Sequence, residues 1–156
     1  MYSIMIMVCC TSIAFSAKPP AQLAEIQKIY KSQLEKINKE YDKTVKEAPL
    51  KYNQNLTALE KTLQSKGDLQ GIMAVRKERD RFSLSKEVTD ELLVTTPKPL
   101  KKLQQQYMAS EIDADINKTE EINKLTEAYL KRLEKVKKSL TVKGNIDEAL
   151  LIQAEI

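Results

Sequence analysis

Apolar residues recur along much of the chain at steps of three, four and four positions, which gives a period of eleven. Three such series run through residues 23–63: Leu23, Leu34, Val45 and Leu56; Ile26, Ile37, Ala48 and Leu59; and Tyr30, Tyr41, Tyr52 and Leu63. Eleven residues in three turns is about 3.67 residues per turn, slightly more than in a straight α-helix. The pattern predicts a long helix with one apolar seam and, at most, a weak right-handed supercoil.

The same pattern occurs a second time, 77 residues further along the chain. The matching positions include Leu23 and Leu100, Ile26 and Leu103, Tyr30 and Tyr107, Tyr52 and Tyr129, Leu56 and Leu133, Leu63 and Leu140, Val75 and Ile152, and Glu78 and Glu155. An internal duplication defines the building block of a fold. The second copy departs from the apolar pattern at Glu111 and Lys118, so we expect its helix to be loosest there.

Each copy is expected to begin with a long helix, over about residues 20–66 and 99–143. Both helices lead into a glycine turn, Lys66-Gly67-Asp68 in the first copy and Lys143-Gly144-Asn145 in the second. Gly suits the left-handed residue at the end of a helix, and Asp or Asn suits the N-cap of the next one.

A short return helix should follow each turn and pack antiparallel on the second half of the long helix. Its apolar positions are Leu69, Ile72, Val75 and Phe82 in the first copy and Ile146, Ala149, Leu150 and Ile152 in the second. The predicted fold class is therefore all-α, with two tandem antiparallel hairpins, each built from a long and a short helix.

The predicted boundaries are a first hairpin over 18–93, a linker over 94–99 and a second hairpin over 100–156. Two prolines in the linker prevent a continuous helix. Pro49 lies inside the first long helix and is expected to kink it or to split it near Ala48. The last return helix is shorter than its counterpart, so we expect the second hairpin to be truncated.

The first 17 residues carry no charged side chain and predict a signal peptide. An apolar run is followed by small residues at Ala14 and Ser16, which fits cleavage after Ser16. The run is short for a membrane span, and Lys and Arg are absent from its start. A secreted or periplasmic protein is therefore the first interpretation. A retained N-terminal anchor and a misplaced start are the alternatives.

Composition excludes several kinds of chemistry from the expected mature chain. His is absent, and the two cysteines, Cys9 and Cys10, both fall in the leader. Catalysis by His, nucleophilic Cys and zinc sites built from either residue are thereby excluded. No Gly-rich phosphate loop or nucleophile motif is present. We expect no catalytic activity, no cofactor, no metal site and no small-molecule substrate.

Charge offers one candidate binding surface. The net charge is +4, from 26 basic and 22 acidic residues, and the two signs are well mixed. A specific nucleic-acid partner is not expected from such a balance. One cluster is denser: Lys131, Arg132, Lys135, Lys137, Lys138 and Lys143. It could contact a polyanion, such as nucleic acid or an acidic polysaccharide, or it could simply offset the negative end of the helix dipole.

Two other recurring features are interpreted as structural. The tyrosines at eleven-residue spacing could form a stacking platform, but the regular spacing favours the edge of a helical seam. Glu78 and Glu155 recur at equivalent places, and we expect solvated glutamates paired with Lys or Arg one turn away. The acidic run Asp113, Asp115, Glu120 and Glu121 lacks the glycine turn of a calcium loop.

Residues 56–78 and 133–155 share a Leu-Glu-Lys-rich stretch, then K-G-[DN]-[LI], then [VI]-x-x-E. This pattern resembles a coiled-coil repeat of secreted proteins from bacteria of the Planctomycetes–Verrucomicrobia group. The resemblance implies secretion and helical hairpins and implies no site.

The first half of each long helix, about 20–45 and 99–122, extends beyond the reach of its return helix. Its apolar stripe must be covered by the other hairpin or by a second chain, because so long a stripe is unusual on a soluble monomer. We therefore expect an exported helical scaffold or protein-interaction module, whose seams pair with a protein partner or with themselves. We expect no transmembrane span. Weak polyanion binding is the alternative function.

Overall fold

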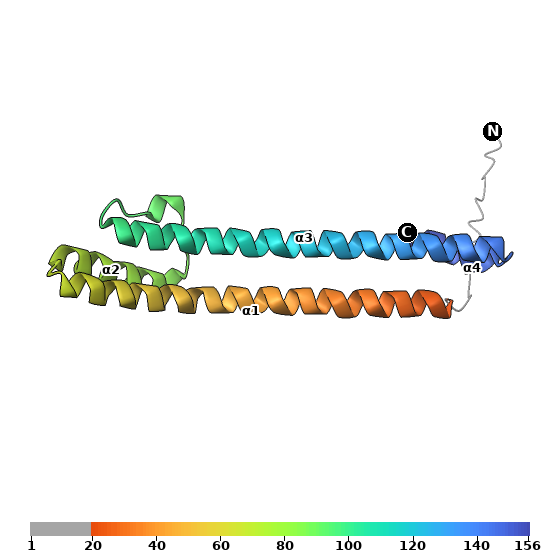
Figure 1. Cartoon of the computed structure of the whole chain (residues 1–156), viewed down its shortest axis with the longest axis horizontal. Helices are drawn as coiled ribbons and strands as arrows, with labels where there is room; N and C mark the ends of the chain where they lie inside the picture. Colours follow the sequence, from red (N-terminus) through yellow and green to blue (C-terminus); the bar gives the residue numbers. More distant parts are fainter. Residues whose placement is uncertain (1–19) are drawn as a thin grey trace, which may run out of the picture.

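The computed structural model describes residues 20–156, and the predicted signal peptide and its cleavage site lie outside them. The described chain forms four α-helices: α1 (Ala21–Ser65), α2 (Leu69–Ser85), α3 (Lys98–Val142) and α4 (Ile146–Glu155). A short 3₁₀ helix, Asp90–Leu92, lies between α2 and α3. The return helix α2 packs on α1 and α4 packs on α3, so the prediction of two tandem all-α hairpins is confirmed (Figure 1).

The glycine turns end the long helices as the sequence predicts. Gly67 and Gly144 adopt φ angles of 69° and 78°, the left-handed conformation that side chains with a Cβ resist. Behind the first glycine, the Asp68 N–H donates to the Leu63 carbonyl at 3.0 Å. The Asp68 carboxylate then accepts from the Gly71 N–H at 2.9 Å and caps α2. Asn145 occupies the equivalent N-cap of α4 but makes no side-chain cap hydrogen bond.

Pro49 does not split α1, which runs as one helix from Ala21 to Ser65 (Figure 1). Of the two expected effects, a kink or a split near Ala48, the split does not occur. An interior proline costs a helix about 3 kcal/mol through a lost hydrogen bond and a steric clash. Here α1 is held to α3 on both sides of the proline, through Tyr41 on one side and Tyr52 on the other. The tertiary contact keeps the two segments in line.

The helices α1 and α3 lie antiparallel and side by side along their length (Figure 1). The Tyr30 and Tyr129 rings pack with centroids 4.5 Å apart at one end, and the Tyr52 and Tyr107 rings with centroids 4.9 Å apart nearer the other. The first half of each long helix is thus covered by the second half of the other. The sequence allows the apolar stripe to be covered by the other hairpin or by a second chain. In the structure, the other hairpin covers it.

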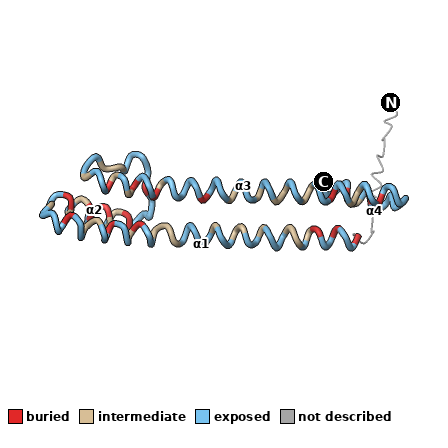
Figure 2. Tube along the Cα trace, in the orientation of Figure 1, coloured by how far each residue is buried: buried red, intermediate tan, exposed pale blue. Residues whose placement is uncertain are grey.

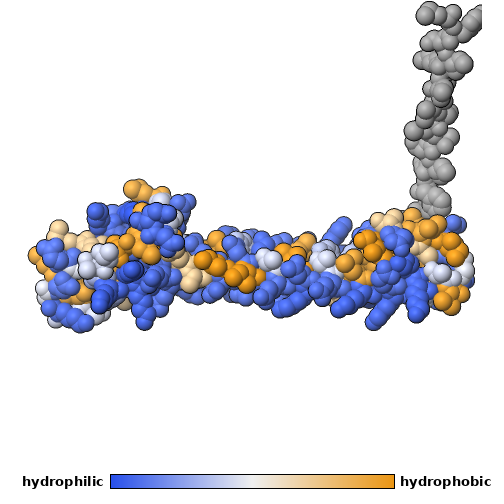
Figure 3. Space-filling model, turned by 90° about the horizontal axis from the view of Figure 1, so that it is seen from above, coloured by the Kyte–Doolittle hydropathy of each residue, from blue (hydrophilic) through white to orange (hydrophobic). Residues whose placement is uncertain are grey.

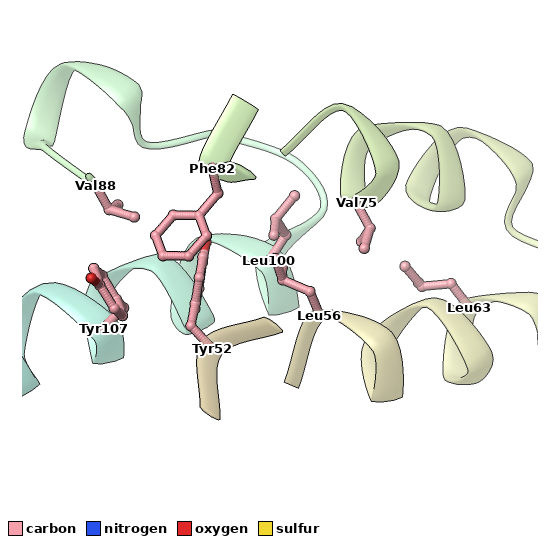
Figure 4. Close-up of a cluster of buried hydrophobic side chains, with 8 residues drawn as sticks. All are labelled: Tyr52, Leu56, Leu63, Val75, Phe82, Val88, Leu100 and Tyr107. Atoms are coloured by element: carbon pink, nitrogen blue, oxygen red, sulfur yellow. The ribbon is translucent and has the colours of Figure 1, made fainter. Parts of the chain in front are cut away.

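Buried side chains gather in two clusters, one near each end of the molecule (Figure 2). The first contains Tyr52, Leu56, Leu63, Val75, Phe82, Val88, Leu100 and Tyr107 (Figure 4). The second contains Leu23, Ile26, Leu133, Leu140, Ala149 and Ile152. Each cluster includes residues from both hairpins, so neither hairpin has a core entirely its own.

These clusters are related by the same 77-residue shift that relates the sequences. Tyr52 and Tyr107 in one cluster correspond to Tyr129 and Tyr30 beside the other, with the two helices exchanged. The molecule therefore has an internal two-fold relation between its hairpins. The axis of this two-fold relation passes close to Tyr41 and Lys118, which are counterparts under the 77-residue shift. The two side chains are in contact, with the lysine Nζ 4.0 Å from the centre of the tyrosine ring.

Replacing Gly67 with Ala should lower the free energy of unfolding by about 1–2 kcal/mol, because Ala would have to adopt a left-handed conformation. Gly67→Asn should lose less, since Asn tolerates that conformation. Urea unfolding followed by circular dichroism measures both changes. Gln70→Ala, on the exposed side of α2, is the control. A Gly67→Ala protein as stable as this control would contradict the explanation of the turn.

Candidate functional site

A buried tyrosine–carboxylate contact lies where α2 meets α1. The Tyr52 hydroxyl donates to Glu78 Oε1 at 2.7 Å. Arg81, one turn further along α2, donates from Nη2 to Oε1 at 2.8 Å and from Nε to Oε2 at 2.9 Å. Both oxygens of Glu78 are therefore hydrogen-bonded, and the charge is balanced by a two-pronged contact with Arg81.

The expected pairing of Glu78 one turn away is present, but the expectation that Glu78 is solvated is wrong. Its exposed fraction is only 4%. On the same helix, Phe82 packs against Tyr52 and Tyr107, with ring centroids 4.7 and 5.2 Å away (Figure 4). The burial of Glu78 depends partly on α3, whose Gln104 lies beside the carboxylate. The sequence around Glu78 gives no sign of this contact.

Two opposing effects set the ionisation of Glu78. Burial by itself raises the pKa of the carboxyl, and the hydrogen bonds from Arg81, Tyr52 and Gln104 lower it. The hydrogen bonds prevail, so the pKa of Glu78 lies below its ordinary value. Burial and the contact with Glu78 raise the pKa of the Tyr52 hydroxyl, which stays protonated. The arrangement is suited to holding α2 in one position on α1 rather than to transferring a proton.

The second hairpin repeats this contact in a more exposed form. The Tyr129 hydroxyl donates to Glu155, the counterpart of Glu78. Burial and the contact with Glu155 raise the pKa of Tyr129 to about 12. Gln27 contributes to the low pKa of Glu155 just as its counterpart Gln104 does for Glu78. This glutamine pair is not among the predicted site residues, although the 77-residue spacing relates Gln27 to Gln104.

Gln104 also connects the linker to α3. It is fully buried, its amide donates to the Leu92 carbonyl at 3.1 Å, and its oxygen accepts from the Val94 N–H at 2.9 Å. The start of the linker is therefore fixed to the helix that follows it.

A groove follows the contact between α1 and α3 and is lined by these two helices alone. One end is lined by Thr44, Glu47, Ala48, Lys51, Tyr52, Asn55, Leu103, Gln106, Tyr107 and Ser110. The middle is lined by Lys36, Ile37, Glu40, Tyr41, Thr44, Ala114, Asn117, Lys118 and Glu121. The other end is lined by Ile26, Ile29, Tyr30, Gln33, Leu125, Ala128, Tyr129 and Arg132. Apolar and tyrosine side chains form its floor, and polar and charged ones form its edges.

The groove has the same two-fold relation as the fold. Every residue lining the end around Tyr30 has its 77-residue counterpart lining the end around Tyr52. In the middle, Ile37, Glu40, Tyr41 and Thr44 correspond to Ala114, Asn117, Lys118 and Glu121. A surface with this symmetry presents the same shape after half a turn, although its charges differ between the two halves.

The tyrosines belong to the seam, as the spacing predicts, and they are not free stacking surfaces. Tyr52 and Tyr107 are buried, and Tyr30 pairs with Tyr129. The Tyr41 hydroxyl donates to Asp115 Oδ1 at 2.7 Å. The ring faces that pack between α1 and α3 are therefore occupied by neighbouring rings and are not available for a sugar or base to stack on.

The predicted polyanion contact does not form one continuous surface. Lys137 is directed toward α4, where its Nζ donates to Gln153 at 2.9 Å. It also pairs with Glu134 of its own helix, α3. Arg132 lines the groove. Lys131, Lys135 and Lys138 are exposed one turn apart on the same face of α3, and Arg132, also exposed, lies one turn before Lys135. Polyanion binding stays a prediction that rests on these four residues, with Lys143 beyond the helix end.

Residues 20–156 contain neither a side-chain group that could hold a metal ion nor a helix that could cross a membrane. No group of three or more Asp, Glu, His or Cys side chains in this part of the chain is arranged to hold a metal ion. None of its helices combines the length and the apolar character that crossing a membrane requires. Apolar side chains nevertheless reach the surface at separate places along the molecule (Figure 3).

Comparison with known proteins adds no relative to this description. No protein-family model matches the chain, and no curated protein or solved structure is significantly similar to it. The resemblance to secreted Planctomycetes–Verrucomicrobia coiled-coil segments therefore stays a prediction.

Glu78→Gln should lower the free energy of unfolding at neutral pH by about 1–3 kcal/mol, because Arg81 and Tyr52 lose a charged acceptor. The effect should depend on pH with a definite sign. Since the folded-state pKa is lowered, the contribution of Glu78 is complete above the unfolded carboxyl value of about 4.3 and is lost as pH falls through the folded value.

Urea unfolding at a series of pH values checks this. The stability difference between the original protein and Glu78→Gln should shrink as the pH falls below that value. Glu35→Gln, an exposed site on α1, is the control and should change little. A difference that stays constant down to acidic pH would show that the carboxylate is not what stabilises this contact.

Proposed function

We propose that this protein is an exported helical scaffold that acts as a protein-interaction module, presenting the groove between α1 and α3 to partner helices. The observation that carries the proposal is the groove itself, which follows most of the α1–α3 contact and is lined by the two long helices alone. Its apolar floor and charged edges are the features by which an amphipathic helix is recognised.

The side chains along the groove suit helix docking. Ala48, Ala114 and Ala128 line it at the two ends and the middle, and small residues allow a third helix to approach closely. The tyrosines contribute large apolar surface while their hydroxyls stay hydrogen-bonded. Helices packed in this way lie about 8–10 Å apart, with the ridges of one in the groove of the other.

Export is supported by the uncharged, apolar first 17 residues and by the small residues before Ala17. A mature chain without cysteine also depends on helix packing alone for its stability outside the cell. The extended pair of helices suits a spacer or platform better than a module that encloses a ligand.

Photo-crosslinking from two neighbouring positions tests the interaction. Ser110 lines the groove, and Ala109, also exposed, lines none of its stretches. A photoreactive benzoylphenylalanine placed at 110 in the exporting cell should give crosslinked species of higher mass, and the same group at 109 should not. Crosslinks of equal yield from both positions, or none from 110, would remove the support for a groove partner.

A further inference from the structure

We propose that the partner helices in the groove are those of a second copy of this chain, docked face to face so that α1 of each copy lies on α3 of the other. The proposal rests on the proposed function and names its partner. The two-fold axis of the dimer would run along the length of the α1–α3 pair, between the two grooves. The product is an antiparallel four-helix arrangement of the kind found in bundles.

The position of each residue along the common axis of α1 and α3, here called its level, follows from contacts within one chain. Tyr30 lies beside Tyr129, Tyr41 beside Asp115 and Lys118, and Tyr52 beside Tyr107. Half a turn about the long axis exchanges α1 and α3 while leaving every residue at its level. A residue of α1 therefore meets the α3 residues of the second copy that lie at its own level in the first.

Charges in the middle of the groove fit this arrangement. Lys36 and Glu40 line it from α1, and Glu121 and Lys118 line it from α3. By level, Lys36 would face Glu121 of the second copy and Glu40 would face Lys118 of the second copy, and the symmetry repeats both pairs. Within residues 20–156 of one chain, Lys36, Glu40 and Lys118 form no ion pair. Lys118 lies over the Tyr41 ring, and Glu121 pairs with the exposed Lys124 at 3.1 Å, so Lys36 of the second copy would share Glu121 with Lys124.

The other face-to-face arrangement brings like charges together. In that arrangement α1 lies on α1 of the second copy and α3 lies on α3. The two-fold axis of the dimer is then perpendicular to the helices and passes near Tyr41 and Lys118, at the middle of the helix pair. Lys118 would then meet Lys118 of the second copy. Juxtaposed like charges weaken an interface, so the charge pattern selects the first arrangement.

The floor of the groove supplies the apolar part of the interface. Ile37 and Ala114 lie in the middle, and Leu103 and Leu125 lie toward the two ends. Each is met by the same end of the groove in the second copy, because half a turn about the long axis leaves every residue at its level. An apolar centre with charged edges is the usual composition of such an interface.

Light scattering after size exclusion, over a concentration series of the full-length chain, tests the proposal. We expect the mass of a dimer for the original protein and for Ala109→Glu, and the mass of a monomer for Ala128→Glu. Both alanines are exposed on α3 and both variants gain the same charge, but only Ala128 lines the groove. Because all three proteins share residues 1–17, association through that segment would leave Ala128→Glu a dimer and would overturn the proposal.

A charge exchange tests the orientation. Lys118→Glu should raise the dimer dissociation constant on the order of tenfold or more, since it would place two acidic groups together twice. Adding Glu40→Lys to the same chain should restore the dimer. Thermal unfolding of dilute protein, where each variant is monomeric, shows whether the fold itself changed. Failure of the second change to restore association, with the fold intact, would exclude this arrangement.

The two proposals can fail separately. An original protein that stays monomeric at all concentrations overturns the dimer. If position 110 then gives crosslinks to a protein of another mass, the interaction module stands and its partner is a different protein. If neither association nor crosslinking occurs, both proposals fall.

Discussion

Neither long helix can bury its apolar seam alone, because its return helix covers only the second half. The antiparallel contact between α1 and α3 meets this requirement for both helices at once. Each first half is covered by the second half of the other helix, and each buried cluster draws residues from both hairpins. The position of α2 and α4, the aromatic pairs and the groove all follow from this one contact. A change that weakened it would expose the first halves of both seams together.

The parts of this structure that depend on neighbouring residues could be predicted from the sequence. Gly67 and Gly144 mark the helix ends within a residue or two, because a left-handed residue and an N-cap are local requirements. The uninterrupted course of α1 through Pro49 could not be predicted, since its cause is packing on α3. Here a tertiary contact outweighed a strong local preference.

The candidate sites show the same division. The pairing of Glu78 with a basic residue one turn away is local and was predicted, whereas its burial, where Gln104 of α3 also reaches it, was not. From the sequence, the first half of each seam could be covered by the other hairpin or by a second chain. A repeat shows which surfaces are alike, but it does not show which of them are in contact. The charged edges of the groove are likewise visible only once Glu40 and Lys118 lie at the same level across two helices.

The linker between α2 and α3 has a consequence for the assembly of the fold. Gln104 holds Leu92 and Val94 of this connection on α3, so the two hairpins are joined by a tether that is partly fixed in place. A tether of this kind replaces a meeting of two molecules by a meeting within one, at an effective concentration in the millimolar range or above. Two hairpins whose mutual attraction is modest can then stay together at any dilution. The tether thus allows the α1–α3 interface to be only as strong as a weak complex.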